Sequence, residues 1–376
     1  MIVYLVAFVF TLIFVRYAAL YYNKIKAIKS NSGVSRMQNK EDNLSLLRKY
    51  RLYYILFFLF AIFPLFFVAA VRYDVGTDYF YTYVPNFLKI LNGESPYTEW
   101  GFNQLNRFIQ LFTDNPQWLF VVTSLIFTFV LIQTIVRYSS NVSISVIVVL
   151  LSCVFFVFLN NVRQLIAAVF FLRAFPYIKN RNFLKYVVCM LLGCVFHLSA
   201  LVMILPYFIV NFKFIRKNFA LIAVLATLLL PFFAQVMKVI IMNTKYKYFF
   251  DSEFNNGNVT VINIIYNLFF FIVSYTVLYK RLNVDKTAYV LIFMQFLAFL
   301  VSALSLFISI SELISRFTTY FQIFQILLIP YCFTTLTNKT DKIIYLSGYI
   351  LAYALYLIYF IILKGYHHVL PYHWIF

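Results

Sequence analysis

Long apolar runs separated by short polar gaps dominate this chain of 376 residues. An α-helix needs about 20 apolar residues to cross the hydrocarbon core of a bilayer, and many of the runs have this length. They are continuous, unlike the short alternating segments of a membrane β-barrel. The pattern therefore predicts an all-α, polytopic transmembrane helical bundle of about 10–12 spans. The expected spans are 2–22, 52–71, 117–136, 143–159, 162–178, 185–211, 219–241, 260–279, 287–309, 314–334 and 343–363.

The composition agrees with this class. Hydrophobic residues make up 64% of the chain and charged residues 11%. A water-soluble protein cannot bury so much apolar surface, and no polar block of the size of a soluble domain interrupts the runs. We therefore expect a single integral membrane domain over residues 1–376. All four cysteines lie inside apolar runs, which is typical of small buried side chains and not of a disulfide framework or a metal site.

The net charge of +19 is distributed unevenly. Gap 23–51 holds eight Lys and Arg residues, whereas gap 72–116 holds three, together with five acidic residues. The positive-inside rule therefore predicts that 23–51 is a basic cytoplasmic loop and that 72–116 is an external, periplasmic or extracellular, loop. The basic excess then marks topology and attraction to anionic membrane lipid, and it does not indicate a nucleic-acid surface.

The charge pattern around His197 conflicts with a simple span. Gaps 179–184 and 212–218 are both basic, but one helix over 185–211 would place them on opposite sides of the membrane. We therefore expect this segment to enter and return, as a re-entrant pair or two short helices with His197 at the external turn. Irregular backbone at membrane depth needs protein or water around it, which suits a site. One long tilted helix is the alternative.

Three arginines stand at predicted external ends of spans. Arg72 ends the second span, Arg163 lies between two apolar runs, and Arg316 begins a later span. Arginine beside hydrocarbon is costly, and guanidinium binds phosphate oxygens in a bidentate manner, so together they predict a site for a lipid-linked diphosphate. Snorkelling of Arg72 and pairing of Arg316 with Glu312 are the alternatives. Further hydrogen-bonding side chains surround Arg163, namely Asn160, Asn161 and Gln164.

Gap 72–116 carries groups that suit a sugar. The aromatic residues after Asp78 predict a partly amphipathic helix in the interface plane, and an acid, a tryptophan and amides follow at Glu99–Arg107. An ordinary interfacial loop is the alternative.

A neutral His197 is able to accept a proton from a sugar hydroxyl, although a buried histidine bonded to the backbone fits as well. The remaining histidines, which we interpret as solvated or interfacial packing, are His367, His368 and His373.

Five motifs follow one another along the chain. They are Arg72-Tyr-x-Val-Gly76-Thr77-Asp78-Tyr79, Glu99-x-Gly101-Phe102-x-x-Leu105-Asn106, Asn161-x-Arg163-Gln164-x-x-Ala167, His197-x-Ser199-Ala200 and Arg316-x-x-x-Tyr320-Phe321. In this order and spacing they resemble the EpsG family, which belongs with the Wzy-type polysaccharide polymerases. The resemblance runs from about residue 50 to 335. One departure is Trp100, which replaces the proline of the Glu-Pro-Gly-Phe that is common in the family.

The resemblance implies a glycosyltransferase of the bacterial cytoplasmic (inner) membrane. Such proteins polymerise oligosaccharide repeat units on undecaprenyl diphosphate at the external face, so that donor and acceptor are both lipid-linked. The products are O-antigen, capsule or exopolysaccharide. No nucleotide sugar or other cofactor is needed, and the chain has no Gly-rich phosphate loop. A flippase and a chain-length regulator are candidate protein partners. A flippase or transporter of the same lipid-linked glycans, or a glycan ligase, remains an alternative.

The motifs also suggest roles for single residues. Arg163, helped by Arg316 and Arg72, is expected to hold the donor diphosphate and stabilise its departure. His197 is favoured as the base for the acceptor hydroxyl, with Asp78 and Glu99 as the alternatives. The other expected substrate-binding residues are Tyr79, Asn161, Gln164 and Tyr320.

Overall fold

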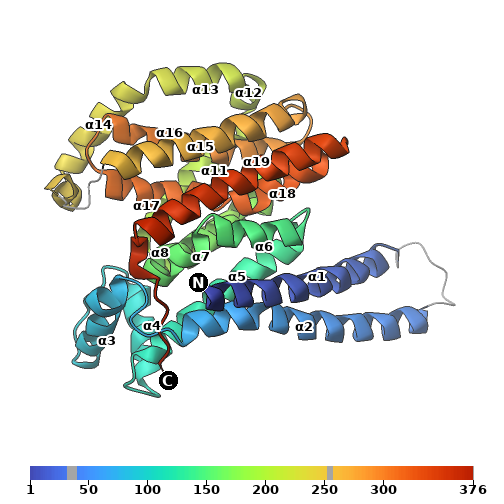
Figure 1. The fold of residues 1–376 in the computed structure, drawn as a ribbon, viewed down its shortest axis with the longest axis horizontal. Helices are drawn as coiled ribbons and strands as arrows, with labels where there is room; N and C mark the ends of the chain where they lie inside the picture. The colour runs from blue at the N-terminus through green and yellow to red at the C-terminus, as the bar shows by residue number, and fades with distance from the viewer. Residues whose placement is uncertain (32–39, 252–256, 376) are drawn as a thin grey trace. The chain divides into compact units, whose positions relative to one another are not determined.

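A computed structural model describes residues 1–31, 40–251 and 257–375 (Figure 1). Most of these residues lie in helices, and one isolated β-bridge pairs Arg72 with Trp374. Within the described ranges, six helices are long and apolar enough to cross a membrane, or up to eight if each of two bent helix pairs is one span. The all-α polytopic bundle is therefore confirmed, with fewer full-length spans than the apolar runs predicted.

Breaks inside the expected spans explain the lower number. The run 162–178 divides into α8 (Val162–Arg173) and α9 (Phe175–Lys179), and the run 314–334 divides into α17 (Ser311–Gln322) and α18 (Gln325–Thr335). Pro176 lies in the first turn of α9, where a missing backbone N–H costs nothing, whereas a proline in a helix interior would break the hydrogen-bond ladder. Hydropathy alone does not register such breaks.

The helices group into two compact units, and the single membrane domain expected from the sequence stays a prediction. Unit 1 comprises Met1–Val169 and Leu357–Phe376, and unit 2 comprises Phe170–Tyr356. The elements of unit 1 are α1 (Ile2–Asn31), α2 (Lys40–Ala70), η2 (Tyr79–Tyr83), α3 (Val84–Leu91), α4 (Trp100–Gln110), α5 (Gln117–Tyr138), α6 (Val142–Leu151), α7 (Val154–Asn160), the start of α8, η7 (Ile358–Leu363) and η8 (Tyr366–His368).

Helices α1 and α2 form a long hairpin in unit 1 (Figure 1). Aromatic rings join them along their length; for example, Tyr21 stacks on Phe57 with ring centroids 5.6 Å apart. The segment expected as the basic loop 23–51 is helical on both sides of residues 32–39, because Lys and Arg have good helix propensity. Arg36 lies outside the described residues. The cytoplasmic position of this segment stays a prediction.

The segment 72–116 folds into η2, α3 and α4, which confirms the expected amphipathic helix. One face of α4 is buried through Phe102, Asn103, Asn106 and Ile109. This spacing is that of one face of a helix, while Trp100 on another face is 75% exposed. Helix α3 likewise buries two of its apolar residues.

Unit 2 contains the remaining helices, most of them short. They are the rest of α8, α9, α10 (Phe183–Phe196), η3 (Leu198–Ile204), α11 (Leu205–Asn211), α12 (Lys213–Lys217), α13 (Phe219–Leu228), α14 (Leu230–Met242), η4 (Lys245–Asp251), α15 (Gly257–Leu278), η5 (Tyr279–Arg281), α16 (Lys286–Ala303), η6 (Leu304–Leu306), α17, α18 and α19 (Lys339–Leu357), whose last residue is counted with unit 1.

The segment around His197 is a helical hairpin. Helix α10 ends at Phe196, the backbone of the following His197 is extended, and η3 with α11 then returns. The two ends meet: Arg181 donates through Nε to the side-chain oxygen of Asn211 over 3.1 Å and through Nη2 to its backbone oxygen over 2.9 Å. The Tyr186 hydroxyl also donates to the Met203 carbonyl across the hairpin. The expected short-helix pair is therefore confirmed, and a single long helix is excluded.

The basic gaps of unit 2 gather at one end of it. Arg216 donates to the backbone carbonyls of Leu282 and Asn283 over 3.0 and 2.7 Å. Arg281 in turn donates to the carbonyl of Thr335 over 3.4 Å. With the contact between Arg181 and Asn211, these bonds bring the basic residues Arg181, Arg216 and Arg281 to one end of unit 2, as a common side of the membrane requires. That this side is cytoplasmic stays a prediction.

The hairpin predicts a labelling pattern. In a protein whose native cysteines are replaced by alanine, Arg181→Cys and Lys213→Cys are expected to react with a membrane-impermeant maleimide from the same side. A Leu198→Cys control at the turn is expected to be protected from that side. The hairpin would be wrong if residues 181 and 213 were labelled from opposite sides of sealed vesicles.

Candidate functional site

Unit 1 brings together Arg163 and Glu99, which are 64 positions apart. Arg163 lies in the first turn of α8, and Glu99 is the residue that precedes α4. Nη1 of Arg163 donates to Oε2 of Glu99 over 2.6 Å, and the two side chains are 22% and 5% exposed, respectively. This partly buried ion pair ties the 72–116 segment to α8, so two residues predicted for the site from separate motifs are in contact.

Aromatic rings enclose the guanidinium of Arg163. Its central carbon lies 4.6 Å from the ring centroid of Tyr97 and 5.7 Å from that of Phe102, distances at which a ring face attracts a cation. Burial lowers the pKa of Arg163, but the neighbouring Tyr83 and Glu99 outweigh it and raise the pKa above its ordinary value. Nε of Arg163 is buried and has no hydrogen-bond partner in the described part of the protein. The group is thus a permanent cation with an unused donor.

The motif around Asp78 packs against the end of α7. The backbone N–H of Asp78 donates to Oδ1 of Asn160 over 2.8 Å, and Nδ2 of Asn160 donates to Oδ1 of Asn161 over 3.2 Å. Gly76 makes this approach possible, because a Cβ there would lie 2.4 Å from the carbonyl oxygen of Leu159. The fold therefore places Asp78 beside the Asn160-Asn161 pair that precedes Arg163. Gln164, the next predicted residue, is also buried.

Arg72 is inside the protein and not at its surface. Its side chain is 0% exposed, its Nη1 donates to the carbonyl of Ala69, and its guanidinium lies 4.5 Å from the ring centroid of Phe120. Burial lowers the pKa of Arg72 to about 10, so the group is still charged at neutral pH. A direct contact with diphosphate stays a prediction for Arg72. In this structure its guanidinium packs against the rings of Phe120 and Phe158 and does not reach solvent.

Tyr79 is anchored through the same buried region. Its hydroxyl donates to Oε1 of Gln117 over 2.8 Å, and Nε2 of Gln117 donates to the carbonyl of Arg72 over 3.0 Å. The Tyr79 ring stacks on Phe120 with centroids 4.4 Å apart. Burial raises the pKa of Tyr79 to about 12, so its hydroxyl keeps its proton at neutral pH. These contacts position the segment, and substrate binding by Tyr79 stays a prediction.

The predicted residues of unit 2 form a second group around the hairpin turn. The hydroxyls of Ser199 and Tyr320 share a hydrogen bond of 2.8 Å, which joins the turn at His197 to α17. Tyr320 is fully buried. Arg316 lies one helical turn before Tyr320 on α17. The two motifs therefore contact each other through Ser199 and Tyr320.

Arg316 has an acidic partner on its own helix. Its Nη2 donates to Oε1 of Glu312 over 2.5 Å, in the i,i+4 pair that the sequence left open as an alternative. The guanidinium also lies 5.6 Å from the ring centroid of Phe249. Roles for Arg316, His197 and Tyr320 in a reaction stay predictions.

The C-terminal segment is the part of the site that sequence reasoning missed. It runs beside the segment between α2 and η2 (Figure 1). Backbone hydrogen bonds hold it there: Thr77 N–H donates to the carbonyl of His367, and Gly76 N–H donates to that of His368. The His367 ring contacts Asn160, with 2.9 Å between Nδ1 and Nδ2. The side chain of His367 therefore makes a specific polar contact in addition to packing. The sequence held one sign of this, since three of the chain's four histidines lie in this short tail.

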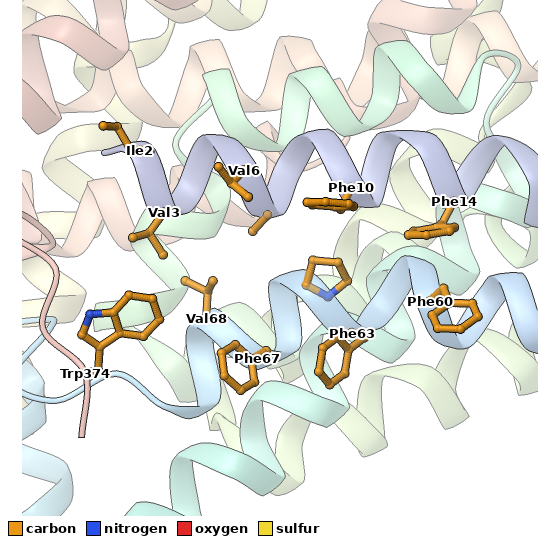
Figure 2. Close-up of a pocket in the computed structure, with 12 residues that line it drawn as sticks. Ile2, Val3, Val6, Phe10, Phe14, Phe60, Phe63, Phe67, Val68 and Trp374 are labelled. Atoms are coloured by element: carbon orange, nitrogen blue, oxygen red, sulfur yellow. The ribbon is translucent and has the colours of Figure 1, made fainter. Parts of the chain in front are cut away.

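An apolar groove of about 510 Å³ lies between α1 and α2. Figure 2 shows aromatic side chains of the two helices facing each other across it: Phe10, Phe14, Phe60 and Phe63. Trp374 from the C-terminal segment stands at one end, near Val3 and Val68.

In the described residues, no group of three or more His, Cys, Asp or Glu side chains is arranged to hold a metal ion.

The EpsG family model matches residues 55–374. The chain belongs to the EpsG family. EpsG proteins are Wzy-like, polysaccharide-polymerase or glycosyltransferase-type membrane proteins. Neither the curated proteins nor the solved structures contain a match to this chain. The EpsG match covers the predicted site residues of both unit 1 and unit 2. It also extends through the C-terminal segment to Trp374, well beyond the motif that begins at Arg316.

Proposed function

We propose that this EpsG protein is a glycosyltransferase of the bacterial cytoplasmic membrane that polymerises undecaprenyl-diphosphate-linked repeat units on the external face. The observation that carries the proposal is the Arg163–Glu99 pair, enclosed by Tyr97 and Phe102 at the start of a helix. It combines a fixed cation, an unused buried donor and aromatic rings, which suit a phosphorylated sugar. The family supports polymer synthesis as the outcome.

The reaction is the transfer of a growing glycan to an acceptor hydroxyl. The hydroxyl oxygen bonds to the anomeric carbon, the bond from that carbon to the diphosphate oxygen breaks, and the lipid diphosphate leaves with the bonding electrons. Negative charge increases on the departing diphosphate, so a guanidinium that is already oriented stabilises the transition state. Arg163 fills this role, and Glu99 orients it through the 2.6 Å contact.

A base must take the proton of the acceptor hydroxyl. The Glu99 carboxylate is engaged by the guanidinium of Arg163, which suits an orienting role better than that of the base. Asp78 is the other acid of unit 1 that the motifs select, and its backbone N–H is fixed by Asn160. His197 remains the residue that the motif favours, since a neutral imidazole suits proton transfer near neutral pH. The exposed ring of Trp100, next to Glu99, is able to stack on the apolar face of a sugar.

The apolar groove supports a lipid-linked substrate. It lies on two helices that are long enough to span the membrane, and apolar side chains line it (Figure 2). Because the carrier chain comes from the bilayer and not from water, the groove would hold it through van der Waals contacts and shape, and not through a hydrophobic transfer energy. Part of the polyisoprenoid chain of a donor or acceptor would fit such a groove.

A reconstitution tests the proposed function. Purified protein in lipid vesicles, given only one defined undecaprenyl-diphosphate-linked repeat unit, is expected to produce a ladder of longer lipid-linked glycans that gel electrophoresis resolves. Transfer to a different acceptor without a ladder would indicate a ligase. Movement of the substrate between leaflets without any new glycosidic bond would indicate a flippase and would exclude the enzyme.

A further inference from the structure

The side chain of His367 contacts Asn160, which is hydrogen-bonded to Asp78 and Asn161 in unit 1. Its Nδ1 lies 2.9 Å from Nδ2 of Asn160, across 207 positions of the chain. Asn160 is bonded in turn to the backbone N–H of Asp78 and to the side chain of Asn161. We propose that His367 is a positioning residue of the polymerase site, whose neutral imidazole accepts a hydrogen bond from Asn160. The inference rests on the proposed function for its catalytic consequence.

The hydrogen-bond chemistry determines the direction of this contact. A backbone N–H only donates, so the atom of Asn160 that faces Asp78 must be its oxygen. The amide nitrogen therefore faces His367, and an amide nitrogen only donates. Nδ1 of His367 must then be the acceptor, which places the ring proton on Nε2. Protonation of Nδ1 would set two donors against each other.

The backbone around His367 is held in an unusual conformation. Gly365, His367 and His368 all have positive φ values, of 58°, 66° and 48°. Left-handed backbone is unfavourable for residues with a side chain, and it persists where the surrounding structure enforces it. Here Thr77 N–H donates to the carbonyl of His367 over 3.1 Å, which fixes the turn against the Asp78 motif.

Loss of the contact between His367 and Asn160 is expected to affect Arg163, the proposed catalytic residue. Asn160 fixes the backbone of Asp78 on one side and the side chain of Asn161 on the other, and Arg163 follows two residues later. Loss of the acceptor on His367 leaves one N–H of Asn160 without a partner in a largely buried position, which loosens both contacts. His367 acts through Asn160, so it is a positioning residue and not a catalytic one.

Two variants of His367 distinguish a role as hydrogen-bond acceptor from a role in packing alone. His367→Ala removes the acceptor and is expected to lower the initial rate of ladder formation about tenfold. His367→Asn places Oδ1 where Nδ1 was and tolerates left-handed backbone, so it is expected to retain most of the rate. The matched control is His368→Ala, a change at an exposed side chain with a similar positive φ, and its rate is expected to stay within about twofold of wild type.

Two outcomes would overturn the proposal: a His367→Ala protein as active as His368→Ala, or a His367→Asn protein as slow as His367→Ala. A wild-type protein that makes no ladder is a different failure, because it rejects the proposed function itself. A second measurement then still decides the role of His367.

Nitrogen NMR of the histidine rings is that second measurement. Protein labelled with ¹⁵N-histidine has four ring systems, and the His367 signal is the one lost in His367→Asn. We expect a neutral ring with the proton on Nε2 at pH 7.5. In Asn160→Asp, a carboxylate oxygen replaces the amide nitrogen, and we expect the proton on Nδ1. A wild-type ring protonated on Nδ1, or no change in Asn160→Asp, would overturn the assignment.

Discussion

Arg163→Ala is expected to lower the rate of polymer formation by about 10²–10³-fold, because removal of one oriented donor at a developing negative charge typically costs this much. The reconstituted ladder assay measures it. Arg163→Lys keeps the charge but not the planar fork, so we expect it to recover only part of the rate. The matched control is Arg107→Ala, which removes a partly exposed arginine of the same segment whose Nη2 bonds to Ser95. Its rate is expected to be near that of wild type.

A folding defect must be separated from a catalytic one. Arg163→Ala leaves the carboxylate of Glu99 buried without its partner, and breaking a buried ion pair costs about 3–5 kcal/mol of stability. Replacement of both partners by leucine removes both charges and is often neutral for stability. If Arg163 binds diphosphate, the Arg163→Leu/Glu99→Leu double variant regains thermal stability and stays inactive. An active double variant would show that the pair only tethers the segment.

Gly76→Ala is expected to be the most damaging small change in the 72–79 segment. A Cβ at this position would lie 2.4 Å from the carbonyl oxygen of Leu159 and 3.2 Å from Cα of Asn160. The backbone also has φ +97°, which L side chains rarely adopt. The segment must therefore move away from α7, and the bond from Asp78 to Asn160 is lost. We expect a loss of about 3 kcal/mol or more in unfolding free energy, seen as a lower midpoint of thermal unfolding, together with a lower rate of polymer formation.

Substitutions at two other glycines distinguish the cost of backbone strain from the cost of a steric clash of the added Cβ. Gly93 has φ +90° but nothing within 4 Å of the added Cβ, so Gly93→Ala measures the backbone strain alone. Gly348 has neither feature, and Gly348→Ala within α19 is expected to be neutral or slightly stabilising, because alanine has the higher helix propensity. The close packing of the segment on α7 would be wrong if Gly76→Ala were no more destabilising than Gly93→Ala.

The membrane class and the hairpin at His197 were predictable because each depends on a local property. A span is a matter of run length and hydropathy, and a change of side is a matter of charge in the gaps. The charge pattern predicted that the segment 185–211 turns back, and the contact between Arg181 and Asn211 agrees with that return. Span number was less predictable. Breaks such as that before Pro176 shorten helices without altering the mean hydropathy of the run.

The candidate site was predictable as a set of residues but not as an arrangement. Ordered motifs selected Glu99 and Arg163 separately, and only folding places their charged atoms 2.6 Å apart. Arg72 illustrates the opposite outcome. An arginine at the end of a span indicates an exposed cation, yet the aromatic side chains of unit 1 enclose it completely. Burial depends on neighbours that are distant in sequence.

The sequence by itself determined the chemistry available to this protein: an apolar helical framework, polar motifs at the ends of spans, and membership of the EpsG family. The tertiary structure decided which of those groups meet. His367 shows why, since it contacts Asn160 across 207 positions through a turn with left-handed backbone. Neither hydropathy nor charge pattern encodes a pairing at such a separation, because each describes neighbouring positions, whereas a hydrogen bond depends on geometry that the complete fold supplies.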